Sequence, residues 1–250
     1  MNQYTRILMY HSICTPPKEA GAPLYCVSRE NIRKQMGYLG TVPFGDSPQI
    51  TFDDGDITNY TQALPVLKEF KLKAFFFILA GRIGTEGYMT WEQVRELKDS
   101  GMTIGSHCMT HRILSGLPDD ELDRELCYSK KMIEDDIGMK VAYISIPRGF
   151  YDRRVINRAR EAGYEAVYTS DPQDNDGYCF GRIPVMASWD LAKFERVVER
   201  GLPPGDCVKS AVRRSAIRML GVNRYERIRT GLAGMGRRTT KRSKITSIRG

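Results

Sequence analysis

The chain has 250 residues, of which 41% are hydrophobic and 27% charged, as in globular proteins with one sizeable core. Residues 1–200 hold 25 basic and 28 acidic residues, a balance of −3, whereas residues 201–250 hold 13 and 2, a balance of +11, so the net charge of +8 arises from the C-terminal tail. The longest apolar run, residues 74–80, is far shorter than the roughly 20 residues that span a bilayer, so no transmembrane helix is expected.

Short apolar segments alternate with helical patterns along the chain, as in proteins built from strand–helix units around a parallel sheet. The expected strands are residues 7–10, 49–52, 74–79, 103–106, 143–146 and 165–169, with a weaker candidate at 182–185. The expected helices are residues 29–39, 62–70, 91–100, 119–136, 153–162 and 191–200. The helix at 91–100 has the clearest boundaries, because Thr90 and Gln93 form a capping-box pattern and Gly101 suits a left-handed C-cap. The pattern predicts an α/β fold in which the helices pack around a parallel sheet.

The tail begins where Pro203, Pro204 and Gly205 interrupt this pattern, which predicts a first domain at 1–202 and a basic tail at 203–250. Residues 208–220 and 222–232 are compatible with helix. Three interpretations of the tail stay open. In the first, the tail is a solvated segment without a specific partner. In the second, it contacts an anionic membrane peripherally through basic and apolar residues. In the third, it binds nucleic acid, and this is the weakest interpretation because no recognisable nucleic-acid-binding motif accompanies the charge.

The N-terminus lacks the basic start and apolar core of a secretory signal, which predicts a cytoplasmic protein. The six cysteines show no CxxC pair and no repeated spacing, so reduced thiols are expected and disulfides are not. They are Cys14, Cys26, Cys108, Cys127, Cys179 and Cys207.

Polar residues follow several of the expected strands. His11 follows strand 7–10, Asp53 and Asp54 follow strand 49–52, and His107 follows strand 103–106. Because the carboxyl ends of parallel strands in a barrel open on one face, these side chains are expected to be neighbours. His111 lies four residues after His107, a spacing that places both imidazoles on one side of a turn.

Two imidazoles and one carboxylate make a three-ligand metal site with an open position for water. Adjacent carboxylates on an extended backbone point in different directions, so one of Asp53 and Asp54 can bind metal while the other handles a proton. The alternatives are structural: Asp-Gly is common in turns, two histidines can share a surface, and His11 can be a hydrogen-bonded core residue. All three histidines of the chain nevertheless fall where a site would need them.

Three segments resemble motifs of the polysaccharide deacetylases with a NodB homology domain, the carbohydrate esterase family 4 type. Residues 51–55, Thr-Phe-Asp-Asp-Gly, resemble the first motif, and residues 105–111, Gly-Ser-His-Cys-Met-Thr-His, resemble the second, H-[S/T]-x-x-H. Residues 146–151, Ile-Pro-Arg-Gly-Phe-Tyr, resemble the third. The resemblance covers roughly residues 5–187. It implies a distorted (β/α) barrel of about seven parallel strands.

The resemblance also implies roles. Asp53 would be the general base, while Asp54, His107 and His111 would hold a divalent metal, zinc in the first place, with cobalt, nickel, iron or manganese as alternatives. No histidine follows residue 111, so the late acid of many members is absent. The start Leu-Met-Tyr-His resembles a subgroup, exemplified by poly-N-acetylglucosamine deacetylases, in which an early histidine is the acid, and this implies that role for His11.

The third-motif loop departs from the common Arg-Pro-Pro-Tyr pattern. The resemblance implies that a backbone N–H of this loop, around Phe150 or Tyr151, contacts the oxyanion, and Arg148 is the candidate that orients Asp53. The loop residues are Pro147, Arg148, Gly149, Phe150 and Tyr151.

The resemblance implies a metal-dependent hydrolase of carbon–nitrogen bonds. Its substrate would carry an N-acetyl group on an amino sugar, as a polysaccharide or as a lipid- or nucleotide-linked glycan precursor. One alternative is an amidase acting on a non-sugar amide, ureide or imide. A non-catalytic glycan-binding relative is disfavoured, because no ligand or base is lost.

Overall fold

The computed structural model describes residues 6–14, 24–43, 45–203, 205, 206, 212, 224 and 225. The chain divides into two units, Met1–Pro204 and Gly205–Gly250; the boundary expected from sequence lies at residue 202. The expected helices at 208–220 and 222–232 lie almost entirely outside the described residues. In the described part, no helix combines the length and apolarity needed to cross a bilayer.

The first unit is built on one sheet of eight strands, in the order β10-β1-β4-β5-β6-β7-β8-β9, with every neighbouring pair parallel. The predicted α/β distorted barrel is confirmed, with eight strands in place of about seven. The strands are β1 (Ile7–Tyr10), β4 (Gln49–Phe52), β5 (Ala74–Ile78), β6 (Thr103–Ser106), β7 (Tyr143–Ser145), β8 (Ala166–Thr169), β9 (Cys179–Gly181) and β10 (Ile183–Pro184). A separate two-stranded parallel sheet joins β2 (Ile13–Cys14) to β3 (Val27–Ser28).

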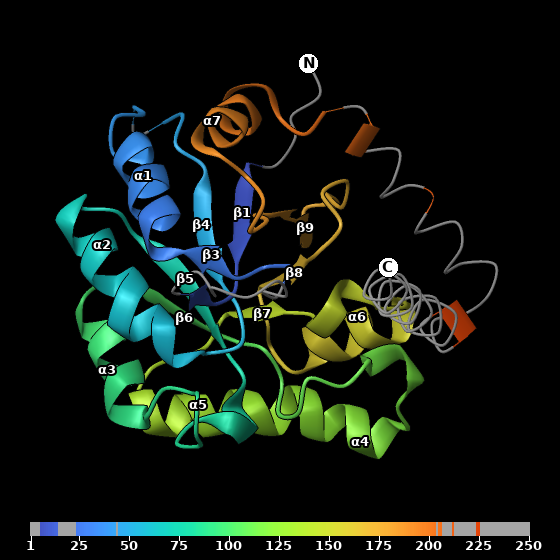
Figure 1. Cartoon of the computed structure of the whole chain (residues 1–250). Coiled ribbons are helices and arrows are strands. Elements are labelled where there is room, and N and C mark those ends of the chain that lie inside the picture. Colours follow the sequence, from blue (N-terminus) through green and yellow to red (C-terminus); the bar gives the residue numbers. More distant parts are fainter. Residues whose placement is uncertain are drawn as a thin grey trace, which may run out of the picture. The chain divides into compact units, whose positions relative to one another are not determined.

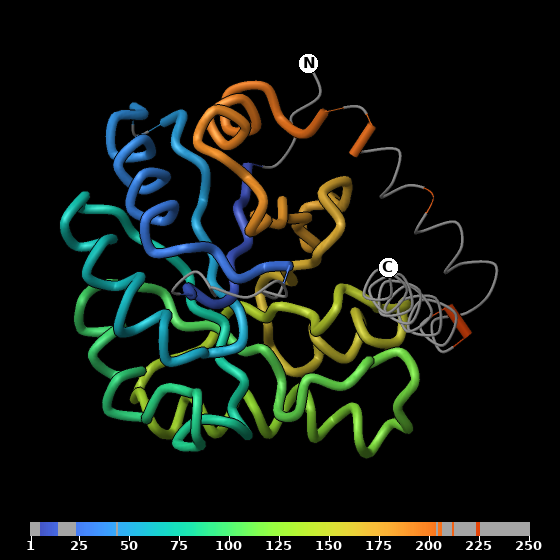
Figure 2. The backbone as a smooth tube through the Cα atoms, in the orientation of Figure 1, coloured from blue at the N-terminus to red at the C-terminus, as the bar shows by residue number. Residues whose placement is uncertain are grey.

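The two edges of the large sheet are β9 and β10, and a single residue, Arg182, connects them along the chain. Strand β10 pairs with β1 through Leu8 and Ile183, so the first and last strands of the barrel lie side by side (Figure 2). The connection β9–Arg182–β10 is called the seam below. It carries the buried Arg182 side chain into the barrel.

Helices surround the strands (Figure 1). They are α1 (Arg29–Leu39), α2 (Leu64–Glu69), α3 (Trp91–Asp99), α4 (Asp119–Asp123), α5 (Ser129–Ile137), α6 (Arg153–Glu161) and α7 (Leu191–Arg200), with 3₁₀ turns η2 (Ala80–Arg82), η3 (Leu114–Gly116) and η5 (Pro147–Gly149). Two π-helical turns, η1 (Asn59–Ala63) and η4 (Arg124–Tyr128), precede α2 and join α4 to α5. The predicted capping box is confirmed, because Thr90 Oγ1 accepts from the amide of Gln93 and Gln93 Oε1 accepts from that of Thr90.

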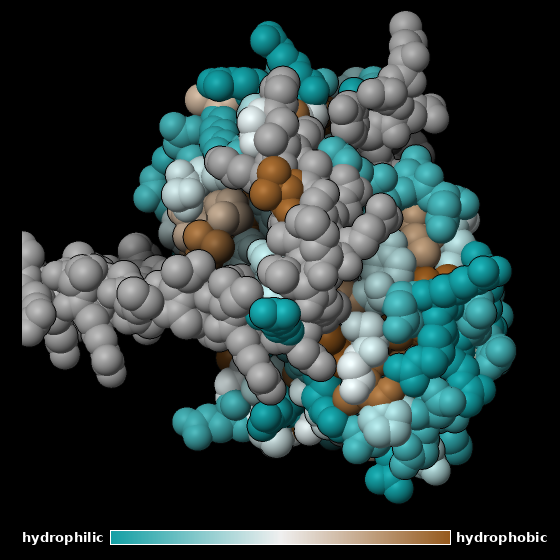
Figure 3. Space-filling view, turned by 90° about the vertical axis from the view of Figure 1, so that its right-hand side faces the viewer, coloured by the Kyte–Doolittle hydropathy of each residue, from teal (hydrophilic) through white to brown (hydrophobic). Residues whose placement is uncertain are grey.

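Strand residues alternate between two environments, as the period of two in an extended chain requires. Leu8, Phe52 and Phe76 pack in the large core with residues of the surrounding helices. Phe77 and Tyr168 instead belong to a second cluster, which fills the inside of the barrel together with the partly buried Phe75, Tyr143 and Phe180. The face seen in Figure 3 is largely hydrophilic over its described residues, with small apolar patches.

The expectation of reduced cysteines is wrong for one pair. Cys14 and Cys26 form a disulfide, with their Cα atoms 5.6 Å apart. The pairing of β2 with β3 brings the two residues together, and their spacing in the sequence gives no sign of this. Cys108, Cys127 and Cys179 are free thiols, and Cys207 lies outside the described residues.

Candidate metal centre and active site

The side chains of the site come from the carboxyl ends of neighbouring strands. The amide of Asp53, just after β4, donates to Tyr10 O at the end of β1 (3.0 Å), and the amide of His107, just after β6, donates to Ile78 O at the end of β5 (2.7 Å). Phe52 and Ser106 face the surrounding helices, so the alternation turns Asp53 and His107 into the barrel. The predicted convergence on one face is confirmed.

Asp54, His107 and His111 each offer one ligand atom, and these atoms all lie within 4.8 Å of one another. Asp54 Oδ1 is 3.4 Å from His107 Nε2 and 3.6 Å from His111 Nε2. One oxygen and two imidazole nitrogens form the donor set that zinc and similar divalent cations prefer in catalytic sites.

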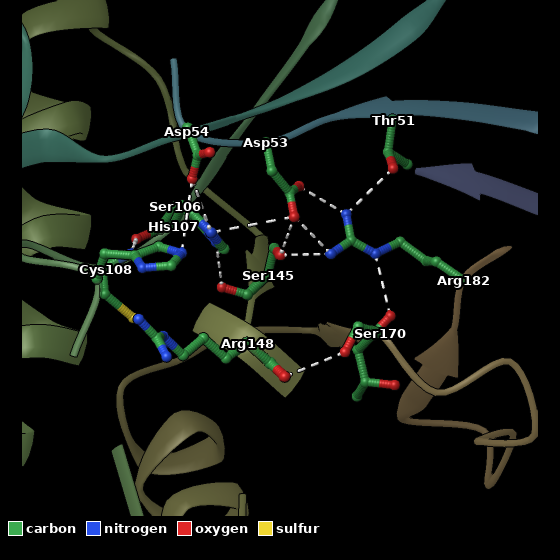
Figure 4. Close-up of polar contacts among 12 residues, drawn as sticks. Thr51, Asp53, Asp54, Ser106, His107, Cys108, Ser145, Arg148, Ser170 and Arg182 are labelled. Carbon is green, nitrogen blue, oxygen red and sulfur yellow. Dashed lines mark hydrogen bonds and ion pairs between the residues drawn. The ribbon is translucent and has the colours of Figure 1, made fainter. Parts of the chain in front are cut away.

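The protonation pattern of His107 fits a cation at this position. His107 Nδ1 lies 2.8 Å from the carbonyl oxygen of Ser145, which can only accept, so Nδ1 carries the hydrogen (Figure 4). In the neutral ring, Nε2 then presents a lone pair toward Asp54 Oδ1, which is buried and makes no hydrogen bond to the described residues. Two facing acceptors need a proton or a metal ion between them, and a histidine oriented through its second nitrogen is the usual metal ligand.

Titration of the two histidines differs. Burial lowers the pKa of His107, but Asp53 and Asp54 outweigh it and the pKa ends above its ordinary value. For His111, burial and the neighbouring His107 lower the pKa to about 4, which keeps this imidazole neutral and able to bind metal.

The backbone around the metal ligands adopts conformations that side chains normally avoid. Four of the five non-glycine residues with positive φ in the described chain lie here: Asp54 (74°), Cys108 (67°), His111 (61°) and Arg148 (60°). Such left-handed residues cost free energy and persist where the surrounding structure holds them.

Glu125, a buried residue on η4, holds the turn between the two histidines. Its carboxylate accepts from the amides of Met109 (2.8 Å) and Thr110 (3.0 Å) and from the Thr110 hydroxyl. On the other side, Ala80 and Gly81 donate their amides to Cys108 O (3.0 Å) and Met109 O (3.1 Å). The turn is therefore fixed from two elements.

Asp53 is almost fully buried, and its carboxylate is held by Arg182 of the seam (Figure 4). Arg182 donates from Nη1 to Oδ1 (2.6 Å) and from Nη2 to Oδ2 (2.7 Å), a two-pronged pair. Ser145 Oγ donates to Asp53 Oδ2 (3.1 Å) and accepts from Arg182 Nη2 (2.7 Å). Burial alone raises the pKa of Asp53, but Arg182 and His107 outweigh it and hold the pKa well below its ordinary value. Asp53 is therefore an ionised, oriented carboxylate.

The expectation that Arg148 orients Asp53 is wrong. Arg148 is exposed and lies on η5, where its carbonyl oxygen accepts from Ser170 Oγ (3.2 Å), and in Figure 4 its side chain runs away from Asp53. Sequence reasoning missed Arg182 and Ser145. One signal was present: an arginine at the start of an expected buried strand needs a buried anionic partner.

The third-motif loop follows β7, the strand that carries Ser145. Pro147 and Phe150 are buried, and the Gly149 amide donates to Ile146 O (3.0 Å). Burial raises the pKa of the Tyr151 hydroxyl, and the negative charge of Asp174 adds to the rise.

His11 lies at the end of β1, beside the strand that carries Asp53. Burial lowers the pKa of His11 below its ordinary value, and the charges of Asp53 and Asp54 only partly offset this, so His11 is within electrostatic reach of both carboxylates. Its ring stacks on Tyr25. All five residues expected to act in the site therefore lie together.

A family model described as polysaccharide deacetylase matches residues 45–167, a range that includes Asp53, Asp54, His107 and His111. YxkH of Bacillus subtilis (strain 168), whose name assigns it to the polysaccharide deacetylases, is 30% identical over 210 residues, covering 77% of this chain and 75% of that protein. The peptidoglycan-N-acetylglucosamine deacetylase of Bacillus cereus (strain ATCC 14579) is 33% identical over 129 residues, 50% of this chain and 58% of the relative.

Solved structures share the fold. The Streptococcus pyogenes deacetylase PplD, solved in complex with acetate, matches with a TM-score of 0.70 and 23% identity, over 79% of this chain and 97% of that one. IcaB from Ammonifex degensii matches with a TM-score of 0.63 and 25% identity, over 78% of this chain and 95% of that one. Both matches extend over most of the first unit.

Proposed function

Because the chain belongs to the polysaccharide deacetylase family and is a hydrolase of carbon–nitrogen bonds of that type, we propose that it removes the N-acetyl group from an amino sugar of a glycan. The observation that carries this proposal is that residues able to bind a metal lie next to a residue able to accept a proton. The metal-ligand set of Asp54, His107 and His111 adjoins the ionised Asp53. Relatives named for peptidoglycan and chitooligosaccharide deacetylation support the substrate class.

An acetamide resists hydrolysis because water is a weak nucleophile and the amine leaves only when it is protonated. A divalent metal, zinc in the first place, supplies a more acidic water and polarises the carbonyl when it is bound. Asp53 takes the proton of the attacking water, since Arg182 keeps it ionised and Ser145 fixes its rotamer. His11 donates a proton to the nitrogen as the carbon–nitrogen bond breaks, giving acetate and a free amine.

The test separates metal binding from proton transfer. Asp53→Asn is expected to lower acetate release from N-acetylated chito-oligosaccharides by 10²-fold or more, in keeping with the usual worth of about 10²–10⁴ for a general base. Bound metal, measured by elemental analysis, should stay at the wild-type level. His107→Ala should lose both. Full turnover in Asp53→Asn contradicts the assignment of the base.

Substrate choice is tested on the same enzyme. Acetate release is compared across chito-oligosaccharides, acetylated nucleotide sugars and lipid-linked sugars, and hydrolysis of a simple ureide, the non-sugar amide, is followed by the release of amine or ammonia. Hydrolysis of an amino-sugar substrate supports the proposal, whereas activity on the ureide alone favours the non-sugar amidase.

A further inference from the structure

The imidazole of His11 lacks the contact that usually orients a proton-transferring histidine. Such a ring is normally held by a hydrogen bond at its second nitrogen, as His107 is held at Nδ1 by Ser145 O. His11 Nδ1 is buried and has no hydrogen-bond partner among the described residues. Something other than a hydrogen bond at this atom has to fix the ring.

Tyr25 provides the contact. Its ring is stacked on His11, with centroids 5.0 Å apart and planes inclined by 23°. A parallel stack restrains an imidazole about χ2, because rotation of either ring separates the two faces. The contact is made by the face of the tyrosine ring and not by its hydroxyl group.

The backbone on both sides of Tyr25 is restrained. Leu24 O accepts from the Ala187 amide (2.9 Å) beyond β10, and Cys26 is bridged to Cys14. The backbone just after His11 is tied to the same segment, since the Val27 amide donates to Ser12 O (3.1 Å). The two stacked residues therefore belong to one frame closed by a disulfide and by backbone hydrogen bonds.

We propose that Tyr25 is a positioning residue for His11, holding the imidazole for delivery of its proton to the departing nitrogen. The inference rests on the proposed function, in which His11 is the acid. Tyr25 touches His11 and is assigned no role in bond making. The aromatic face takes the place of the hydrogen-bonding partner.

The first experiment compares two substitutions at one position. Tyr25→Leu removes the ring face and is expected to lower kcat for N-acetyl hydrolysis about 10- to 100-fold, the scale of an ångström-level misplacement of a reacting group. Tyr25→Phe keeps the face and is expected to retain most activity. Tyr38→Leu, a partly buried tyrosine on α1 that contacts Phe194, is the matched control and should leave kcat unchanged.

A second substrate distinguishes positioning from general damage. An aryl acetate releases a phenolate, which departs without a proton, so its hydrolysis needs Asp53 and the metal ligands but no acid. Tyr25→Leu and His11→Ala are expected to hydrolyse the aryl acetate at near wild-type rates while failing on the amide. Asp53→Asn should fail on both. A Tyr25→Leu enzyme that loses both reactions equally overturns the inference.

The two failures are distinguishable. If His11→Ala keeps full amide hydrolysis, the proposed acid is wrong, and the inference about Tyr25 falls with it. If His11→Ala loses amide hydrolysis while Tyr25→Leu keeps it, only the positioning role of Tyr25 is overturned.

Discussion

At the scale of single residues, the pairing of Asp53 with Arg182 both orients the proposed base and contributes to the stability of the fold. Both side chains are buried, and a buried charge left without its partner is costly, whereas a two-pronged, fully hydrogen-bonded pair is tolerated. The pKa of Asp53 is lowered in the folded protein, so its contribution to stability is present above the unfolded value of about 4 and is lost as the pH falls below it.

Removing Arg182 should therefore affect stability and activity together. Arg182→Met leaves the carboxylate buried and unpaired, and is expected to lower the free energy of unfolding by about 3–5 kcal/mol. Asp53→Asn/Arg182→Met should recover part of this loss without recovering activity. Urea denaturation and acetate release measure the two effects, and equal stability of the single and double variants contradicts the account.

Of this pair, Asp53 could be predicted from the sequence and Arg182 could not. Asp53, Asp54, His107 and His111 were predicted because they sit in local motifs that follow strands. Arg182 lies 129 residues from Asp53 along the chain, and no local pattern connects the two. Arg148 was chosen because it lies within the third motif, and only the closure of the barrel shows that Arg182 fills the role.

At the scale of elements, the turn from His107 to His111 depends on what packs against it. Gly81, in η2, approaches this turn so closely that a Cβ atom there would lie 2.5 Å from the carbonyl oxygen of Met109. A side chain at this position has to displace the backbone that joins the two imidazoles, since that contact is with main chain.

Gly81→Ala is expected to weaken metal affinity about 10- to 100-fold, the usual effect of disturbing the groups that support metal ligands. Gly45→Ala is the control, because its Cβ would meet no atom within 4 Å. Metal titration with a competing chelator measures the difference, and circular dichroism checks that both variants fold. Equal affinity in the two variants would show that the turn tolerates the displacement.

Elements were predictable where a periodic pattern is long. Helices α1 and α7 match the expected bounds, because each carries an apolar stripe and an N-cap residue, Ser28 and Asp190. The two-residue strands β2 and β3 and the three-residue β9 were missed, because segments this short carry little pattern of their own, and the equally short β10 was expected only as the weaker candidate at 182–185. The expected helix at 119–136 is interrupted by η4, a π-turn that places Glu125 against the metal turn.

The Cys14–Cys26 disulfide is a separate prediction at this scale. Replacing both residues by serine is expected to lower the free energy of unfolding by about 3 kcal/mol, from the added freedom of the unfolded chain. Cys127→Ser, at an exposed free thiol, is the control. Recovery of Cys14 and Cys26 as separate thiols from unreduced protein, by peptide mass spectrometry, contradicts the bridge.

At the scale of the whole molecule, the role of the basic tail and the cellular compartment of the protein remain predictions. Disulfides persist in oxidising compartments, so the expected cytoplasmic location loses the support of reduced cysteines. Cell fractionation of the native protein is the direct measurement.

The basic tail is tested by its affinity for membranes. If the balance of +11 over residues 201–250 drives peripheral attachment, the chain should co-sediment with anionic liposomes at low salt, because each basic residue gains about 1 kcal/mol near such a surface. Binding should be lost at high salt and on deletion of residues 207–250. Co-sedimentation that survives the deletion would place the contact elsewhere.

The seam also sets an order of events while the protein is made. Synthesis proceeds from the N-terminus, so the residues that hold the metal, Asp54, His107 and His111, leave the ribosome well before Arg182 does. Until β10 reaches β1, the carboxylate of Asp53 has no guanidinium to orient it. A nascent chain can therefore acquire its metal ligands while still lacking an oriented base, and hydrolytic competence begins only when the last strand joins the first.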